Sequence, residues 1–420
     1  RMNRYSFRPS VVSRAYLEWP RTVALAGTNP FNGPIERRGN SLIVLPDERA
    51  RLDLLIPYLD GCYSDTEVEG IAPAFMKSSG EFNGPKTRER LVGRVSFDPS
   101  RIVRYPFKPF DIRIAYVDPM IAPLFSRPAP ELLDQASIDG NAYFITRDTA
   151  DKSQEGPPFL FSSLVCDYDC VSGHARHFPL LIRADTQNSD TDTAVELMYG
   201  TQQGEKSIAP NLSQPTLEYL ARLGIDDAAW SSIQMANLIW MHALAIGYSP
   251  AYLNENADGL HEDWPRIPLP KAKKTLQASA ALGRRIAALL DTENPVEGVT
   301  AGKIDPRLKD IAAVSKVGEG NLNPDAGHLD LTAGWGHAGK GGVCMPGTGK
   351  HQTRAQPDAT LKEVFGAETL DIYLNDIAYW SNVAKCVWEY HIGGYQVIKK
   401  WLSYREKAIL GRGLRVEEAE

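Results

Sequence analysis

Two cysteines and two histidines in the stretch "CDYDCVSGHARH" have the residue types that bind zinc or support nucleophilic catalysis; they are Cys166, Cys170, His174 and His177. Thiolate and imidazole groups form tetrahedral zinc sites, and a cysteine beside a histidine is the usual pair of thiol enzymes. The spacing is unlike that of zinc fingers, and no orienting acid is evident. We therefore predict buried cysteines running into a polar loop, with no metal ligand and no catalytic residue here. The alternative function is a zinc- or thiol-dependent enzyme centred on 166–177.

A second segment, "GWGHAGKGGVCMPGTGKHQTR" at 334–354, is rich in glycine and carries cations without any acid. Exposed backbone N–H groups next to cations suit a phosphate backbone. We predict a Gly-rich basic loop that binds DNA through Lys340, Lys350, His351 and Arg354, with the two lysines and the arginine on phosphates. The alternative is a plain flexible loop.

The tetrapeptide "GTGK" at 347–350 resembles part of a nucleotide-binding phosphate loop. That motif needs a glycine where Cys344 stands and a serine or threonine where His351 stands. We therefore expect no nucleotide there, and no cofactor in this chain.

Further basic residues are grouped near the C-terminus, where 399–415 contains six basic residues and one acid. The candidate DNA contacts from this segment and from "GHARH" at 173–177 are Lys399, Lys400, Arg405, His174 and Arg176. The net charge of −6 argues against a protein that coats nucleic acid nonspecifically, but it is compatible with a local patch. The alternative is a set of solvated faces that acids elsewhere balance.

The elements that must position these residues indicate an α+β fold. At 420 residues, with 43% hydrophobic and 23% charged residues, the chain is long enough for two or three globular domains. Residues 1–185 contain short β-branched and aromatic runs, which predict a β-rich half with a mixed or antiparallel sheet. Residues 186–210 are a polar linker, and 211–420 show the periodicity of a mostly helical half.

Composition also limits where the protein works. No apolar run approaches the roughly 20 residues that cross a bilayer, so we predict no membrane span. The first residues, "RMNRYSFRP", lack the apolar core of a signal peptide. Five scattered cysteines do not form a disulfide framework. A reducing cytoplasm is therefore the expected compartment.

One basic-aromatic-proline element occurs twice, as "RYSFRPSVVSRAY" at 4–16 and "RYPFKPFDIRIAY" at 104–116. In the second copy, Ile112, Ile114 and Tyr116 alternate with Arg113, Ala115 and Val117, as in a half-buried strand. We predict that both copies form a strand entered through a turn that the proline restricts, with their aromatic rings in the core.

Several segments resemble the C-terminal specificity (target recognition) region of type ISP restriction-modification enzymes and related adenine-specific DNA methyltransferases. They are "DWPRIPLP", "GKGGVCMPGTGK", "YLNDIAYWSNV" and "VWEYHIGGYQVIKKWLSYRE". The stretch "RYPFKPFDIRIAYVDP" resembles the Tyr-x-Phe-Arg-Pro-Phe-Asp element that follows the methyltransferase in that family. The resemblance runs from about residue 100 to 411.

This resemblance implies a module that recognises a sequence in double-stranded DNA and has no catalytic core of its own. Methyltransferase and nuclease domains are then expected in cis or in trans, and S-adenosylmethionine, magnesium and ATP belong to those domains. The Asn-Pro-Pro-Tyr and motor motifs of the family are absent from this chain, so we expect no catalysis by it alone. The remaining alternative is a scaffold whose proline- and tryptophan-containing segments bind a protein partner.

Overall fold

The computed structural model describes residues 12–36, 42–78, 82–150, 155–184, 207–338, 344–356 and 358–420. The chain forms two compact units. Unit 1 comprises 1–107, 113–151 and 157–291, and unit 2 comprises 108–112, 152–156 and 292–420. The main division therefore falls at 291/292, and the predicted linker, most of which lies outside the described residues, falls within unit 1.

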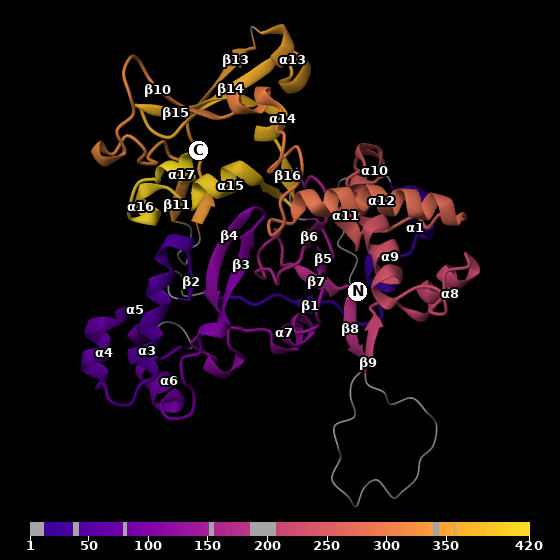
Figure 1. Ribbon diagram of the computed structural model, residues 1–420, viewed down its shortest axis with the longest axis horizontal. Helices are drawn as coiled ribbons and strands as arrows, with labels where there is room; N and C mark the ends of the chain where they lie inside the picture. The colour runs from indigo at the N-terminus through magenta and orange to yellow at the C-terminus, as the bar shows by residue number, and fades with distance from the viewer. Residues whose placement is uncertain are drawn as a thin grey trace, which may run out of the picture. The chain divides into compact units, whose positions relative to one another are not determined.

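The elements of unit 1 alternate short helices with short strands (Figure 1). In chain order they are α1 (Arg14–Glu18), α2 (Thr22–Leu25), β1 (Phe31–Asn32), β2 (Ile43–Val44), α3 (Leu55–Leu59), α4 (Asp65–Ile71), α5 (Pro73–Met76), α6 (Gly84–Leu91), β3 (Ile102–Lys108), β4 (Asp111–Tyr116), α7 (Pro130–Ala136), β5 (Tyr143–Thr146), β6 (Leu160–Ser162), β7 (Arg176–Pro179), β8 (Leu181–Ala184), β9 (Ser207–Pro210), α8 (Gln214–Arg222), α9 (Ser232–Gly247), α10 (Pro250–Glu255), α11 (Ala257–Glu262) and α12 (Lys273–Leu290).

Small sheets hold unit 1 together. One has the order β1-β7-β5-β6, a second the order β2-β4-β3, and a third pairs β8 with β9. Tyr58, Tyr105 and Tyr116 belong to the core around the second sheet. Tyr116 is fully buried in this core, but Asp111, Arg113 and Ala115 on the other side of β4 are buried too, so both sides of this strand are covered.

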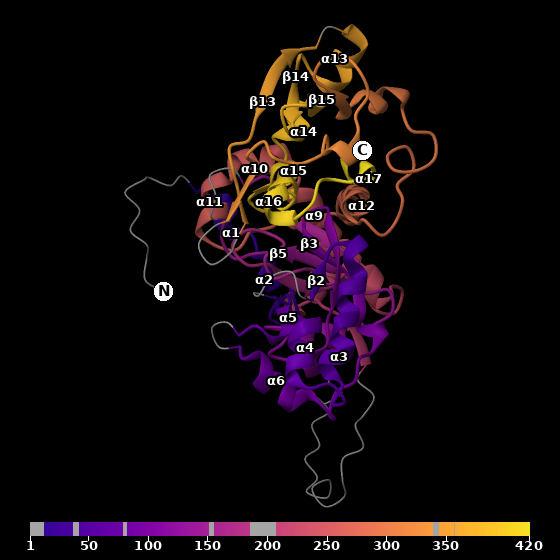
Figure 2. The ribbon, with the colours of Figure 1, turned by 90° about the vertical axis from the view of Figure 1, so that its left-hand side faces the viewer.

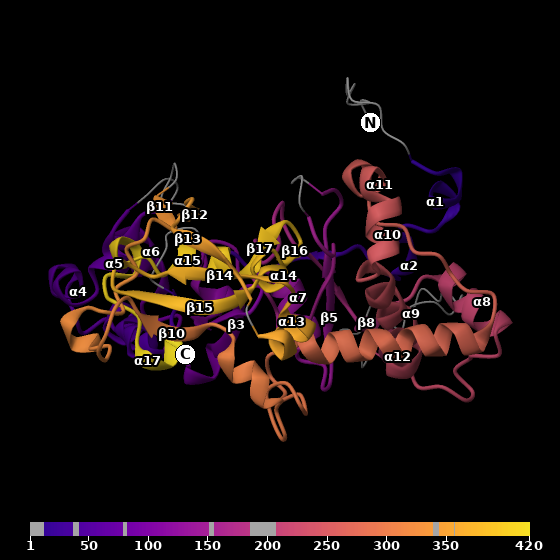
Figure 3. The ribbon, with the colours of Figure 1, turned by 90° about the horizontal axis from the view of Figure 1, so that it is seen from above.

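Helices α9 and α12 are the long helices of unit 1 and run alongside each other (Figure 3). A capping box of Ser231 with Gln234 begins α9. The two backbones approach closely at Gly283, where a Cβ atom would lie 1.8 Å from the carbonyl oxygen of Met241. The helices predicted within 213–290 are therefore confirmed, and the two long ones pack against each other.

Unit 2 combines strands with short helices. Its elements are β10 (Ala313–Lys316), β11 (Gly336–Ala338), β12 (Cys344–Pro346), β13 (His351–Ala355), α13 (Ala359–Phe365), β14 (Glu368–Tyr373), β15 (Ala378–Ala384), α14 (Lys385–Trp388), β16 (His391–Ile392), β17 (Tyr395–Gln396), α15 (Val397–Ser403), α16 (Lys407–Leu410) and α17 (Val416–Ala419).

A four-stranded antiparallel sheet of order β10-β15-β14-β13 organises unit 2 (Figure 2). One of its faces carries Leu370, Ile372 and Trp380, which pack in a core with Trp335 and Leu402. The strand β13 lies at the edge of this sheet, and all five of its residues are exposed. An edge strand with exposed side chains is therefore available to a partner.

The α+β class is confirmed, and the strand pairs of these sheets are antiparallel. The prediction of a mostly helical 211–420 is wrong after residue 292. The Gly-rich segment is not a plain loop there, because it contains β11, β12 and β13. The segments "HQTRA", "ETLDIY" and "AYWSNVA" satisfy their backbone hydrogen bonds by pairing with a neighbouring strand. The residue periodicity within one short segment does not show such pairing.

The prediction that both repeat copies share one backbone shape is wrong over the part that can be compared, since residues 4–11 lie outside the described residues. The second copy forms β3, a turn and β4. In the first copy Arg14–Glu18 form α1, because the Ser13 hydroxyl accepts a hydrogen bond from the Tyr16 N–H at 3.1 Å and caps the helix. Arg113 occupies the equivalent place in the second copy and has no such acceptor. The expectation that the aromatic rings are buried is confirmed for Tyr16, Tyr105 and Tyr116, but it is wrong for Phe110 of the second copy, which is 41% exposed.

Within the described ranges, no helix is long and apolar enough to cross a membrane.

Candidate nucleic-acid interface

The most exposed group of candidate residues lies along β13 in unit 2. Lys350, Gln352 and Arg354 are at alternating positions, so their side chains share one side of the strand. The pairing of Gln352 with Asp371 and of His351 with Ile372 places these three on the sheet face opposite to Leu370 and Ile372. The result is a polar row, which we call the β13 row, defined by Lys350, Gln352 and Arg354.

Arg354 is held in place by a carboxylate beneath it. Its Nε forms an ion pair with Oδ2 of Asp371, whose side chain is 3% exposed, while the Arg354 side chain is 52% exposed. The negative charge of Asp371 raises the pKa of Arg354 further above its usual value. The guanidinium is thus fixed at its inner edge and accessible at its outer side.

Lys350 has a looser partner. Its Nζ lies 2.8 Å from Oδ1 of Asp376, which is 91% exposed, and 4.6 Å from the ring centre of Tyr373. The hydrogen bond to Asp376 raises the pKa of Lys350 and lowers that of Asp376. Because both charges face water, this pair is weak and can open for another anion.

The other candidates of the Gly-rich segment differ. The exposed ring of His351 lies 6.0 Å from that of Trp388, on the core side of the sheet. Lys340 lies outside the described residues, so its role stays a prediction. Gly349 positions the entry to β13: its φ is +60°, and a Cβ there would lie 2.1 Å from the Trp335 ring.

A second basic-aromatic cluster lies in unit 1, in the loop before β7. The rings of Tyr168 and His174 stack with their centres 4.5 Å apart, and Nδ1 of His174 lies 3.1 Å from Oδ1 of Asp169. The guanidinium of Arg176 lies 5.6 Å from the Tyr168 ring. His174 is exposed and stays a candidate contact, whereas Arg176 is half-buried.

Two predicted DNA contacts near the C-terminus are buried. Lys400 is 5% exposed, with its Nζ 5.0 Å from the ring centre of Tyr395 and 4.8 Å from that of Tyr404. Arg405 is 6% exposed and forms an ion pair of 2.9 Å with Asp111. A phosphate cannot reach either side chain, so we withdraw both as DNA contacts. Lys399 is half-buried and stays a prediction. A count of charges along the chain cannot show that Lys400 of α15 and Arg405 after it are buried.

The cysteine and histidine group does not come together around one point. Cys166, Cys170 and His177 are buried, whereas His174 is exposed. The Cys166 N–H donates to Nε2 of His177 at 3.2 Å, so that nitrogen is already used as an acceptor. Among the described residues no cluster of three or more His, Cys, Asp or Glu side chains could hold a metal ion.

Burial also weighs on the thiol alternative. Burial opposes ionisation of Cys166, but hydrogen bonds to Cys170, His177 and Ser162 outweigh it and lower the pKa of Cys166 below its usual value. The thiol is nevertheless 0% exposed. A substrate has no direct access to it.

We expect a thiol titration of the native protein to separate the exposed cysteines from the buried ones. In a Cys344→Ser background, Cys62 and Cys386 are exposed and should react at once with an aromatic disulfide reagent, while Cys166 and Cys170 should react only after unfolding. The low pKa should not help Cys166, because the reagent must first reach it. Rapid labelling of Cys166 at pH 7 in the folded chain would favour the thiol-enzyme alternative.

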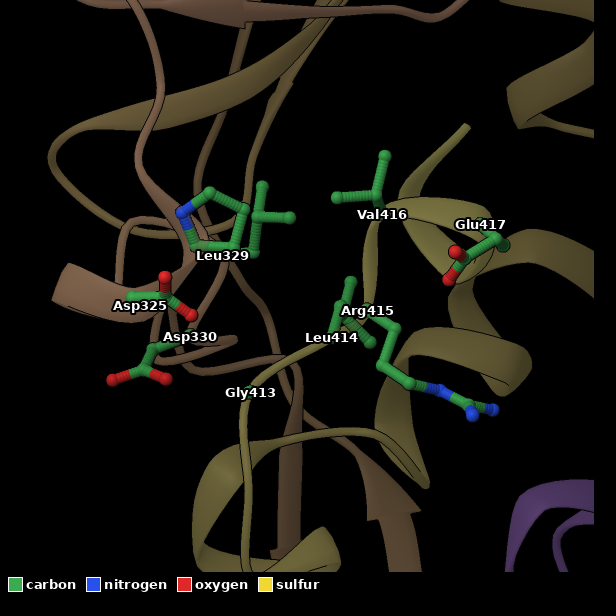
Figure 4. A pocket seen from close by; sticks show the side chains of 9 residues that line it. Asp325, Leu329, Asp330, Gly413, Leu414, Arg415, Val416 and Glu417 are labelled. Atoms are coloured by element: carbon green, nitrogen blue, oxygen red, sulfur yellow. The ribbon is translucent and has the colours of Figure 1, made fainter.

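A pocket of about 420 Å³ opens in unit 2 between the segment around Leu329 and the one leading into α17 (Figure 4). Asp325, Asp330 and Glu417 line it together with Arg415. Asp330 is also bound by Lys407, with Nζ to Oδ2 at 2.5 Å. A mainly acidic lining repels phosphate, so this pocket does not extend the basic surface.

Sequence reasoning missed the residues that organise the two clusters, Gln352, Asp371, Tyr373 and Tyr168. The alternation of "KHQTR" offered a signal for the β13 row, because a strand places its first, third and fifth residues on one side. Nothing in the sequence indicated that Asp371 lies under Arg354.

Comparison with known proteins gives the following results. A family model described as the Type ISP C-terminal specificity domain matches residues 76–417. No curated protein matches the chain. Among solved structures, the cryo-EM structure of a DrdV–DNA complex has a TM-score of 0.51 at 14% identity and covers 90% of this chain and 31% of that one.

Two further structures have TM-scores below 0.5. The ATP-dependent Type ISP restriction-modification enzyme LlaBIII bound to DNA gives 0.47 at 13% identity, over 93% of this chain and 21% of that one. A nuclease-deletion mutant of the Type ISP enzyme LlaGI with a DNA substrate mimic gives 0.46 at 14% identity, over 93% and 25%. The chain thus spans less than a third of each of these proteins.

Proposed function

Because this chain belongs to the family of Type ISP C-terminal specificity domains, we propose that it binds double-stranded DNA and recognises a target sequence for a restriction-modification system. The family match over 76–417 carries this proposal. The fold shared with the DNA-bound DrdV structure supports it, as do the exposed cations of the β13 row and His174.

In this function the cations set the position of the protein on the duplex. Phosphate contacts supply affinity and register but carry no sequence information, so further side chains must contact the base edges. Lys350 suits the first role, because its pair with the exposed Asp376 is easily exchanged for a phosphate.

We propose that catalysis resides in other domains, in cis or in trans. A methyltransferase with S-adenosylmethionine, and a motor and nuclease with ATP and magnesium, would act at the site that this module selects. We also propose a cytoplasmic location, since Cys62, Cys166, Cys170 and Cys386 are free thiols and the partner is DNA.

Salt-dependent binding tests the phosphate role of Lys350. We expect the chain to bind duplex DNA with log K falling linearly against log[salt], and Lys350→Ala to flatten that slope by about 0.9, the value of one phosphate contact. Affinity should fall about equally on target and random duplexes. Lys303→Ala removes an equally exposed lysine of unit 2 and is the matched control. A chain that binds no duplex at low salt but captures a protein partner would support the scaffold alternative instead.

The absence of a catalytic core is tested with labelled S-adenosylmethionine. We expect no transfer of the methyl group to any duplex by this chain alone, because the motifs for that cofactor are absent from its sequence. Incorporation of label into adenine would contradict this expectation.

A further inference from the structure

We propose that the edge strand β13 enters the major groove of the DNA, where Arg354 reads a guanine and Gln352 reads an adenine about two base pairs away. This inference rests on the proposed function and deepens it, because it assigns base readout to two side chains of the β13 row. It also changes the role of Arg354, for which the sequence alone suggested a phosphate contact.

The spacing along β13 fits the rise of the double helix. Gln352 and Arg354 are two residues apart on one side of the strand, which is about 6.6 Å at 3.3 Å per residue. Successive base pairs are about 3.4 Å apart, so two steps span nearly the same distance. The two side chains can therefore meet the edges of two base pairs separated by one other.

The geometry of the sheet admits such an approach. The major groove is about 12 Å wide and accepts a two-stranded β-ribbon. Within the part of the chain that the structure describes, β13 is an outer strand of its sheet, pairs with β14 alone and exposes all five of its residues. The side chains of Gln352 and Arg354 thus project from one face of the sheet at its outer strand, and a strand fixes their positions better than a loop does.

The ion pair with Asp371 favours base readout by Arg354 over phosphate binding. Arg354 and Asp371 together carry no net charge, so their attraction for a phosphate is weak at a distance. The side chain is 52% exposed, and a guanidinium has five N–H donors, more than Asp371 and the Tyr373 hydroxyl can use. Two donors held in one plane match O6 and N7 of guanine, which Arg contacts in bidentate fashion.

Anchoring by Asp371 also lowers the cost of ordering Arg354. A free arginine loses rotamer freedom when it binds a base, and a side chain that is already held loses less. Gln352 has a comparable but weaker support, because its Oε1 accepts a hydrogen bond from the Tyr373 hydroxyl at 3.4 Å. Asp371 and Tyr373 are therefore positioning residues rather than DNA contacts.

The charged side chains along β13 favour DNA over a protein partner as the molecule that binds this edge strand. An exposed edge strand can also add a strand from a protein partner. Lys350, directly before β13, and Arg354 on β13 oppose such pairing, since charged side chains on an edge strand discourage strand addition. Lys350, whose pair with the exposed Asp376 opens easily, also suits the negative potential of DNA.

The test is the selection of bound duplexes from a randomised library with the full chain and its variants. The wild-type chain should give a consensus sequence that contains a guanine and an adenine two base pairs apart. Arg354→Ala should lose preference at that guanine alone, by about 5- to 150-fold, which is the range for one bidentate pair. Gln352→Ala should lose preference at that adenine alone.

Substitution of the selected guanine by 7-deazaguanine, which lacks the N7 acceptor, completes a double-mutant cycle that measures the coupling between Arg354 and this base. It should weaken binding of the wild-type chain and have little further effect on Arg354→Ala. Thermal melting checks that each variant is folded, and Arg354→Lys, which keeps the charge but not the fork, should also lose the preference.

Two results would overturn the inference. Equal weakening of Arg354→Ala on all sequences, with a flatter salt slope, would make Arg354 a phosphate contact and leave the proposed function intact. An unchanged consensus for both variants would place base readout elsewhere in the chain. A wild-type chain that selects no consensus and binds no duplex would instead contradict the proposed function itself.

Discussion

Replacing Arg405 by alanine is expected to lower the free energy of unfolding of unit 2 by about 3–5 kcal/mol, the usual loss when one partner of a buried ion pair is removed. Arg405 and Asp111 are 7% and 1% exposed in their side chains and meet at 2.9 Å, although they are 294 positions apart. The variant leaves the Asp111 carboxylate buried without this partner and removes the guanidinium that stacks 3.8 Å from the Trp401 ring.

Calorimetry measures this loss as a lower melting temperature of the transition in which unit 2 unfolds. The exposed Lys309→Ala is the matched control in unit 2 and should leave the transition nearly unchanged. The double variant Arg405→Met with Asp111→Leu removes both charges, so it should recover part of the stability. A loss no larger than that of the control would mean that Arg405 is free to contact DNA after all.

The second large effect is expected in unit 1, where Trp240→Ala should cost about 3–5 kcal/mol. The Trp240 side chain is 0% exposed, and its ring lies 5.0 Å from that of Phe144 and 5.2 Å from that of Phe178. Truncation leaves a cavity between α9 and the sheet strands β5 and β7, because close-packed neighbours relax only partly.

Trp240→Phe is the informative comparison. The indole Nε1 of Trp240 is buried and has no hydrogen-bond partner among the described residues. Phenylalanine removes that polar atom and keeps most of the ring volume, so its cost should be well below that of alanine. Denaturant unfolding followed by circular dichroism compares the two variants. Equal losses for Phe and Ala would mean that the Nε1 atom does bind a partner, such as a buried water.

The family and the α+β fold class could be predicted from the sequence. The blocks "DWPRIPLP" and "GGYQVIKKWLSYRE" lie inside the range that the family model matches. Helix signals such as the capping box of Ser231 with Gln234 before α9 are local, because the cap and its partner lie within one turn. Tyr16 and Tyr116 are both buried, although the first lies in α1 and the second in β4, so their burial does not depend on strand alternation.

The site was accessible from the sequence only in part. Lys350 and Arg354 were found because charge is visible in composition, and both are exposed. Lys400 and Arg405 were misassigned for the same reason, since a count of basic residues does not show which of them are buried. Ser13 and Arg113 occupy equivalent places in the two copies of the repeat. Ser13 caps the helix α1, whereas Arg113 lies within the strand β4.

By itself, then, the sequence determined the α+β class, the long helices α9 and α12 and the membership of a DNA-specificity family. The tertiary structure alone decided what each charge does. Asp371 comes to lie under Arg354, and Asp111 meets Arg405, because strand pairing and core packing join segments that are far apart in the chain. An electrostatic partner depends on a separation of a few ångströms in space, and no pattern along the chain encodes that distance.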